Sequence, residues 1–293
     1  MLFNGIIVQI IKDEHDYLDH WIKFHTKLGF DFLLVEDINS QSHKEICDKY
    51  NNVTLIEIFD FLSENRINDA FNGKYRQTLV IEEFLDRYIN GMYNKYNFLL
   101  FIDPDEYLHQ NDCYEIQDTY YRLYNDKCMF YRFAWQNMTT NDYNVLFDEH
   151  PNLEIPVYNR FRVKANLLRQ PKMLVNLKFA KELITKTFYD RSINEHGTCL
   201  PHYFGDTEYR DLVSKYSTDF VIYHYSTNSI TEFIKRLTVK GELTKASFNR
   251  NINYFIKNNM QYKNEIIDYC IKNNISLELT GKPNIIIPNK NNI

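Results

Sequence analysis

The sequence is poor in the residues that mark several classes of protein. Only 8 glycines and 7 prolines occur among 293 residues, which excludes collagen-like and linker-like chains and disfavours turn-dense all-β folds. The five cysteines are widely spaced without a C-x-x-C pair, so a disulfide framework or a cysteine-based zinc site is not expected. No window approaches the roughly 18 apolar residues of a transmembrane helix. These absences lead us to expect a cytoplasmic protein with no integral membrane segment.

Charge and apolar content exclude further classes of protein. The chain carries 34 Lys and Arg against 39 Asp and Glu, a net charge of −5, so no nucleic-acid partner is expected. Apolar residues make up 44% and aromatic residues 16% of the chain, which is enough for a core and excludes disorder. At this length, one large domain or one domain with an appendage is expected.

The first half of the chain alternates short apolar runs with amphipathic segments. The run at 5–11 is continuous, as in a strand buried on both faces. Residues 15–28 show helical spacing and end at Gly29. Further strands are expected at 32–35, 53–58, 98–102, 129–133 and 173–179, and further helices at 43–50, 74–93, 231–240 and 264–272. This order predicts an α/β fold with a mostly parallel mixed sheet flanked by helices, followed by a helical C-terminal extension.

Acidic residues at the strand ends carry the chemistry. Asp103 and Asp105 follow a buried strand, and Pro104 between them interrupts the ladder. Open α/β sheets bind ligands at this edge, and hard oxygen ligands suit Mg²⁺ or Mn²⁺ carrying phosphate oxygens. The alternative is a solvated acidic turn. A dehalogenase-type phosphatase is a weaker interpretation, because such enzymes place the motif on the first strand.

Two more acidic loops are expected at the same edge. Asp13 and Glu14 follow the first strand, and Glu36 and Asp37 follow the second. Converging carboxylates repel one another unless a cation or hydrogen-bond donors lie between them, and a nucleoside with a metal-bound diphosphate would supply both. Taken alone, Asp13 could instead cap a helix and Asp37 could be a turn residue.

Several segments together resemble a known family. Residues 10–29 resemble the K-N-E-x-x-Y-L-x-E-W-I-x-Y-H-x-x-L-G opening of glycosyltransferase family 92 and its family 2-like relatives, with Asp13 in place of the usual Asn. Residues 35–40 are similar to their Y-D-N-x-S segment, and residues 101–108 to I-D-x-D-E-F-L. Residues 224–241 resemble H-Y-x-x-K-S-x-x-E-F…K-x-G, with Asn228 in place of Lys.

The resemblance implies a GT-A (Rossmann-like) glycosyltransferase domain over 1–242, with a nucleotide-binding half at 1–110, an acceptor-binding half at 111–242 and an extension at 243–293. Such a hexosyltransferase-like enzyme moves a sugar, with inversion, from a nucleoside diphosphate sugar to an acceptor hydroxyl. UDP-sugar is the favoured donor and Mn²⁺ (or Mg²⁺) the cofactor. By resemblance, the residues that bind the donor are Asp13, Glu14, Asp37, Gln77 and Asp103, and the metal ligands are Asp103, Asp105 and His224.

An inverting transfer also needs a general base near the acceptor. The candidates are Glu195, His196 and Asp148, with Glu149 and Asp142 behind them. Glu195 and His196 precede a glycine, as in an active-site loop, and His196 resembles a family histidine. The alternative is that all of these are surface loop charges.

The acceptor is expected to be a glycan, a protein or a lipid-linked sugar, in a bacterial cytoplasm or in the cytoplasm of a host that a virus has entered. The rival class is a catalytically inactive GT-A-like protein that binds carbohydrate or nucleotide. Such a protein would be expected to lose its metal-binding acids, whereas Asp103, Asp105 and His224 are all present.

Overall fold

The computed structural model of the chain describes residues 3–38, 40–71, 76–111, 115–126, 128, 130–178, 214–225, 229–239 and 245–273. The chain divides into two compact units. The first consists of Met1–Trp135 and Leu168–His224, and the second of Gln136–Leu167 and Tyr225–Ile293. Each unit combines two separate segments of the chain. The expected domain boundary at residue 242 stays a prediction.

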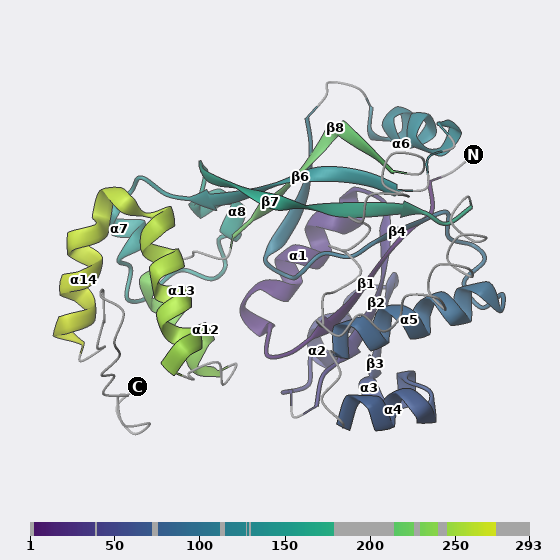
Figure 1. Cartoon of the computed structure of the whole chain (residues 1–293), viewed down its shortest axis with the longest axis horizontal. Coiled ribbons are helices and arrows are strands. Elements are labelled where there is room, and N and C mark those ends of the chain that lie inside the picture. Colours follow the sequence, from purple (N-terminus) through teal and green to yellow (C-terminus); the bar gives the residue numbers. More distant parts are fainter. Residues whose placement is uncertain are drawn as a thin grey trace. The chain divides into compact units, whose positions relative to one another are not determined.

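Four parallel strands form the first part of an eight-stranded sheet (Figure 1). They are β1 (Gly5–Ile11), β2 (Phe30–Glu36), β3 (Val53–Glu57) and β4 (Phe98–Leu100). Their order is β3-β2-β1-β4, and β1 pairs in parallel with β2 on one side and with β4 on the other. Successive strands are added on one side of β1 as far as β3, and β4 is then added on the other side. Open sheets bind ligands at such a switch point, which here lies between β1 and β4.

The remaining strands continue the sheet in the order β7-β6-β8-β5. They are β5 (Glu106–Gln110), β6 (Phe130–Thr139), β7 (Val163–Asn176) and β8 (Ser214–His224). β4 pairs antiparallel with β7, and β5 pairs antiparallel with β8. The predicted mixed sheet is therefore confirmed, with its parallel strands in the N-terminal half.

Helices lie on both faces of the parallel strands, because successive side chains of a strand point to opposite faces. The described helices of the first unit are α1 (His15–Lys27), α2 (Lys44–Cys47), α3 (Ile58–Phe61), α4 (Glu64–Phe71), α5 (Arg76–Ile89) and α6 (Ile116–Asn125). Ile6 and Val8 of β1 share a buried cluster with Leu79 and Phe84 of α5. On the other face, the ring of Trp21 from α1 contacts Phe32 of β2, with centroids 5.4 Å apart.

The structure corrects several expected boundaries. α1 matches its prediction, and Gly29 follows it with a φ of 88°, a left-handed conformation that ends helices. β4 is shorter than the predicted strand at 98–102, because the chain turns at Pro104 into β5, which was not predicted. β7 begins at Val163, well before the expected start at residue 173.

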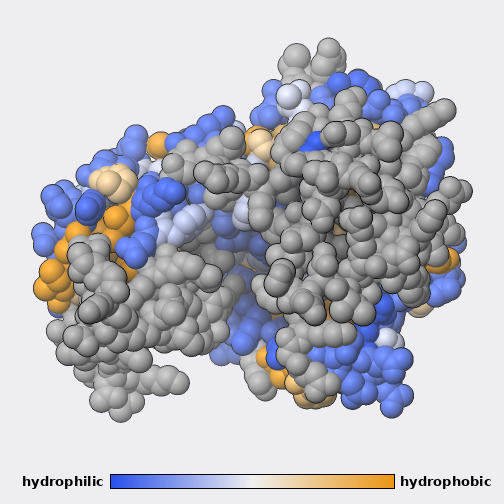
Figure 2. Space-filling model, viewed as in Figure 1, coloured by the Kyte–Doolittle hydropathy of each residue, from blue (hydrophilic) through white to orange (hydrophobic). Residues whose placement is uncertain are grey.

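The second unit is mainly helical. Its described helices are α7 (Tyr143–Leu146), α8 (Val157–Arg160), α12 (Ile230–Val239), α13 (Lys245–Asn258), the 3₁₀ turn η1 (Met260–Tyr262) and α14 (Lys263–Lys272). A buried cluster joins Leu146, Phe233, Phe255 and Ile266. The expected C-terminal helices are thus present, and Figure 2 shows apolar surface over α14, where Ile271 is 65% exposed.

A capping box begins α12. The backbone N–H of Ser229 donates to Oε2 of Glu232, and the Glu232 N–H donates back to Oγ of Ser229. Arg160 holds the same carboxylate through two bonds of 2.9 Å. Over the described residues, no helix is both long and apolar enough to cross a membrane.

Candidate functional site

The candidate site lies at the carboxyl ends of β1, β2 and β4, where the sequence predicted it. The parallel register sets Ile11 opposite Glu36, and the backbone N–H of Asp37 donates to the carbonyl of Ile11 at 2.9 Å. The loops after β1 and β2 therefore leave the sheet side by side.

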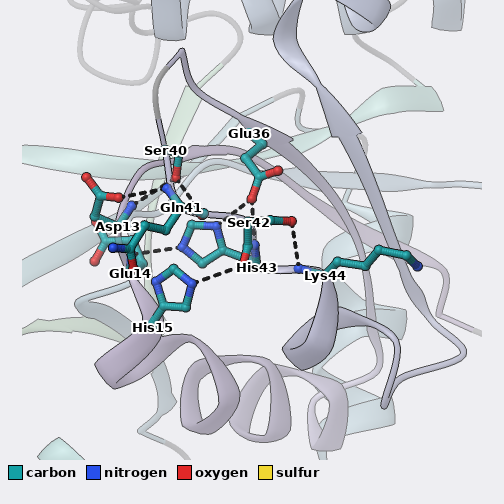
Figure 3. Close-up of polar contacts among 9 residues, drawn as sticks. All are labelled: Asp13, Glu14, His15, Glu36, Ser40, Gln41, Ser42, His43 and Lys44. Carbon is teal, nitrogen blue, oxygen red and sulfur yellow. Dashed lines mark hydrogen bonds and ion pairs between the residues drawn. The ribbon is translucent and has the colours of Figure 1, made fainter.

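Asp13 holds these two loops together (Figure 3). Its Oδ1 accepts the backbone N–H of Gln41 at 3.0 Å, and its own N–H donates to Oγ of Ser40 at 3.2 Å. Asp13 has a φ of 52°, a left-handed conformation that Asn and Asp adopt more readily than other residues with a side chain. The residue at the N-cap of α1 is Glu14, so the alternative role of Asp13 as a helix cap is wrong.

His43 makes a second connection between the same loops. Its backbone N–H and its Nδ1 both contact Oε1 of Glu36, at 2.6 and 2.8 Å, and its Nε2 accepts the backbone N–H of Glu14 at 2.9 Å. His43 is fully buried, and burial lowers its pKa, an effect that Glu36 opposes only in part.

Asp37 is both a turn residue and a charged partner. Its carbonyl accepts the N–H of Ser40, and its Oδ1 accepts Nη1 of Arg76 at 2.6 Å. Arg76 begins α5, so this helix brings a guanidinium to the acidic edge.

Asp103 is surrounded by side-chain donors. Its Oδ1 accepts Nε2 of Gln9 at 2.8 Å and Nε2 of Gln77 at 3.4 Å, and its Oδ2 lies 3.4 Å from Nζ of Lys172. Burial opposes ionisation of this carboxyl, but the charge of Lys172, its hydrogen bond and the nearby His224 together outweigh burial, so the pKa of Asp103 lies below its usual value. Gln77 therefore lies beside Asp103, and its role in donor binding stays a prediction.

Lys172, on β7, is a buried cation between two carboxylates. Its Nζ lies 3.0 Å from Oε2 of Glu106 and 5.1 Å from the ring centroid of Trp135. Asp103 and Glu106 raise the pKa of Lys172 against the opposing effect of burial. Burial raises the pKa of Glu106 to about 7, although Lys172 acts in the other direction. Among the described residues, Oε1 of Glu106 has no hydrogen-bond partner.

The chain between the two carboxylates forms a closed turn. The N–H of Glu106 donates to the carbonyl of Asp103, and the N–H of Asp103 donates to Oε2 of Glu106, both at 2.9 Å. Pro104 occupies the second turn position, which its fixed φ favours. The turn holds Asp105 at the edge of the sheet.

His224 meets Asp105 at this edge. The antiparallel register pairs Glu106 with His224, the last residue of β8, and Nε2 of His224 lies 3.4 Å from Oδ2 of Asp105. Asp105 is only 6% exposed. The imidazole also lies against Trp135, with ring centroids 4.9 Å apart. His224 thus follows the apolar strand from which it was expected to emerge.

The described candidate bases make local contacts within the second unit. Asp148 lies in a turn of the second unit, where its Oδ1 accepts the N–H of His150. Asp142 caps α7 by accepting the N–H of Asn144. Glu195 and His196 lie outside the described residues. The identity of the base stays a prediction.

Sequence reasoning missed residues that complete the site, namely Gln9, His43, Arg76, Glu106 and Lys172. Glu106 belongs to the quoted D-x-D-E segment, so a signal for it was present. Lys172 only precedes an apolar run on a distant strand, and no local pattern marks it as a partner of Asp103.

The described residues contain no group of three or more His, Cys, Asp or Glu side chains with the arrangement of a metal site. Asp103 accepts hydrogen bonds from two glutamines and lies beside Lys172, whereas Asp105 and His224 contact each other.

No protein-family model and no curated protein matches the chain. Among solved structures, the chain is similar to the galactosyltransferase LgtC in complex with donor and acceptor sugar analogues, at 12% identity over 83% of this chain and 96% of that chain, with a TM-score of 0.32. It is also similar to mouse xyloside xylosyltransferase 1, at 10% identity over 76% of this chain and 97% of that chain, with a TM-score of 0.32.

Proposed function

We propose that the protein is a GT-A type glycosyltransferase, related to family 92, that transfers a sugar from a nucleoside diphosphate sugar, with UDP-sugar favoured, to an acceptor hydroxyl. The observation that carries the proposal is the convergence of Asp13, Glu14, Asp37, Asp103 and Asp105 at the carboxyl ends of three neighbouring parallel strands. A nucleotide is the usual ligand of such an edge.

Two of the predicted ligands have the donor types of a divalent cation site, although no third described His, Cys, Asp or Glu completes a cluster with them. Asp105 and His224 offer a carboxylate oxygen and an imidazole nitrogen, a donor pair that suits Mn²⁺. In this proposal Asp105 and His224 hold the ion, and Asp103 lies beside it. When bound, the ion would neutralise the charge that develops on the departing diphosphate.

The protein's own side chains would bind and orient the nucleotide. Asp37, held by Arg76, would accept hydrogen bonds from hydroxyl or base N–H groups of the nucleotide. The turn at Asp13 and Glu14 would line the same side of the binding site. By resemblance Asp103 would contact the ribose, and Gln9, Gln77 and Lys172 would hold its carboxylate in position. An inverting transfer would take the acceptor proton on Glu195, His196 or Asp148.

A second candidate function is nucleotide binding without transfer. One observation favours it: Lys172 already supplies a cation to Asp103, so part of the acidic edge is neutral without a metal. Binding alone does not separate the two candidates, whereas turnover does.

Thermal unfolding of the purified protein with UDP, GDP, dTDP or CMP, each with Mn²⁺ or with EDTA, tests the site. We expect one nucleotide to raise Tm only with Mn²⁺, because a ligand of the native state stabilises it. Release of that nucleotide from its sugar conjugates would then support transfer over simple binding. No shift with any nucleotide would contradict the proposal.

A further inference from the structure

His43 joins the two loops that carry the proposed nucleoside-binding acids. The turn at 12–14 carries Asp13 and Glu14, and the loop at 37–43 carries Asp37. His43 lies at the end of the second loop, and Figure 3 shows its ring between Glu36 and the turn. We call Glu14, Glu36 and His43 the His43 clip.

The contacts determine the tautomer of His43. The backbone N–H of Glu14 can only donate, so Nε2 of His43, 2.9 Å away, must be unprotonated and accept. The ring proton therefore lies on Nδ1 and is donated to Oε1 of Glu36 at 2.8 Å. A neutral imidazole of one tautomer thus links a side chain of β2 to the backbone at the start of α1.

The ring is closed to substrate. His43 is fully buried and both of its nitrogens are engaged. The titratable groups that face it are Glu36 on β2, Glu14 at the N-cap of α1, and His15 on α1, whose ring stacks on it with centroids 4.1 Å apart. His43 has no nitrogen left to contact a reacting atom, so it can act only through the loops that it holds.

We propose that His43 is a positioning residue for nucleotide binding, which fixes the Asp13–Glu14 turn and the Asp37 loop as one preformed surface for the nucleoside. This inference rests on the proposed function. Preformed loops raise affinity because binding then orders fewer residues. The bonds of Asp13 to Ser40 and Gln41 act in the same direction, so the two loops are joined at both ends.

The test is a calorimetric titration of UDP in the presence of Mn²⁺ into the full-length protein and its variants. H43A removes both bonds of the ring. H43N keeps an amide donor near Glu36, and H43Q keeps an acceptor near the Glu14 N–H. Each variant therefore keeps one of the two hydrogen bonds that the His43 ring makes. K44A is the matched control, because the Lys44 side chain pairs with Asp48 on the surface and does not touch the clip.

We expect H43A to raise the Kd for UDP about 10-fold, equivalent to about 1.4 kcal/mol, with H43N and H43Q in between and K44A unchanged. Tm is measured for each variant, because a purely structural role would lower Tm and leave the Kd of the folded protein unaltered. If H43A does not fold, H43N and H43Q provide the comparison.

Wild-type Kd in all the folded His43 variants would overturn the positioning role while leaving the proposed function intact. Failure of the wild-type protein to bind UDP, GDP, dTDP or CMP would overturn the proposed function itself, and the positioning role with it. That result is read from the wild-type titration alone, so the two failures are distinguishable.

Discussion

Leu108 donates its backbone N–H to Nε2 of His25 at 3.2 Å, and Nδ1 of His25 lies 2.9 Å from the carbonyl of Trp21. One turn earlier on α1, Nε1 of Trp21 donates to the carbonyl of Glu106 at 2.8 Å. The two side chains of α1 thus satisfy the free edge of β5, which pairs with β8 on its other side. α1 thereby supports the strand that begins directly after Asp105.

The burial of His25 predicts a pH-dependent stability. Burial lowers the pKa of His25 from 6.5 to about 3, so between these values the unfolded state binds a proton that the folded state does not. The free energy of unfolding should therefore fall as pH drops through this window, by up to about 1.4 kcal/mol per pH unit from this residue. Above pH 6.5 the imidazole is neutral in both states, so this destabilisation is absent.

Urea unfolding of wild type and H25Q between pH 3 and 7 measures this slope. We expect a smaller slope for H25Q and an unchanged one for H150Q, since His150 is exposed. His109, whose pKa burial lowers to about 4, retains its own contribution in both variants. Equal slopes for wild type and H25Q would contradict the prediction.

Removal of Lys172 should destabilise the first unit strongly. K172M leaves the carboxylates of Asp103 and Glu106 facing each other without their buried cation. Loss of one member of a buried ion pair costs about 3–5 kcal/mol. Chemical unfolding should show this loss, and the double variant K172M/E106Q should recover part of it, because one of the opposing charges is then absent.

K178M is the matched control for Lys172, because Lys178 lies on the same stretch of chain with an exposed side chain. We expect it to change stability little. A loss in K172M no larger than that in K178M would show that the buried cluster does not depend on this ammonium.

Asp105 and His224 should act as a pair toward Mn²⁺. D105N and H224Q each remove one donor of the proposed site, so each should weaken the Mn²⁺-dependent affinity for UDP by about 10-fold or more, as changes around metal sites do. Nucleotide titrations with Mn²⁺ and with EDTA check this. D219N, on the same strand as His224, is the control.

The position of Asp13 predicts an order among its variants. A φ of 52° costs an ordinary side chain about 1–2 kcal/mol. D13N should keep wild-type stability, because Asn tolerates this conformation and its Oδ1 can still accept the Gln41 N–H. D13G should lose only the side-chain hydrogen bond to Gln41. D13A should lose this bond and also carry the cost of the left-handed conformation. Thermal unfolding measures the order, and a D13A as stable as D13N would refute it.

Local pattern was sufficient for much of the first unit. The apolar run before Lys12 and the spacing from His15 to Leu28 predicted β1 and α1, because each period corresponds to one kind of backbone. The turn at Asp103–Glu106 joins two short strands instead of ending one longer strand, and Pro104 is the residue that divides them. β5 was missed because its residues continue an acidic loop with no clear period.

The order of residues along the chain sets acidic residues at the ends of three strands, and parallel pairing then brings them to one edge of the sheet. Which of these residues meets a partner depends on the folding of distant segments. His224 reaches Asp105 through an antiparallel register between distant strands, and Lys172 reaches Asp103 across 69 residues of chain. Such contacts depend on non-local pairing and burial, which no short stretch of sequence encodes.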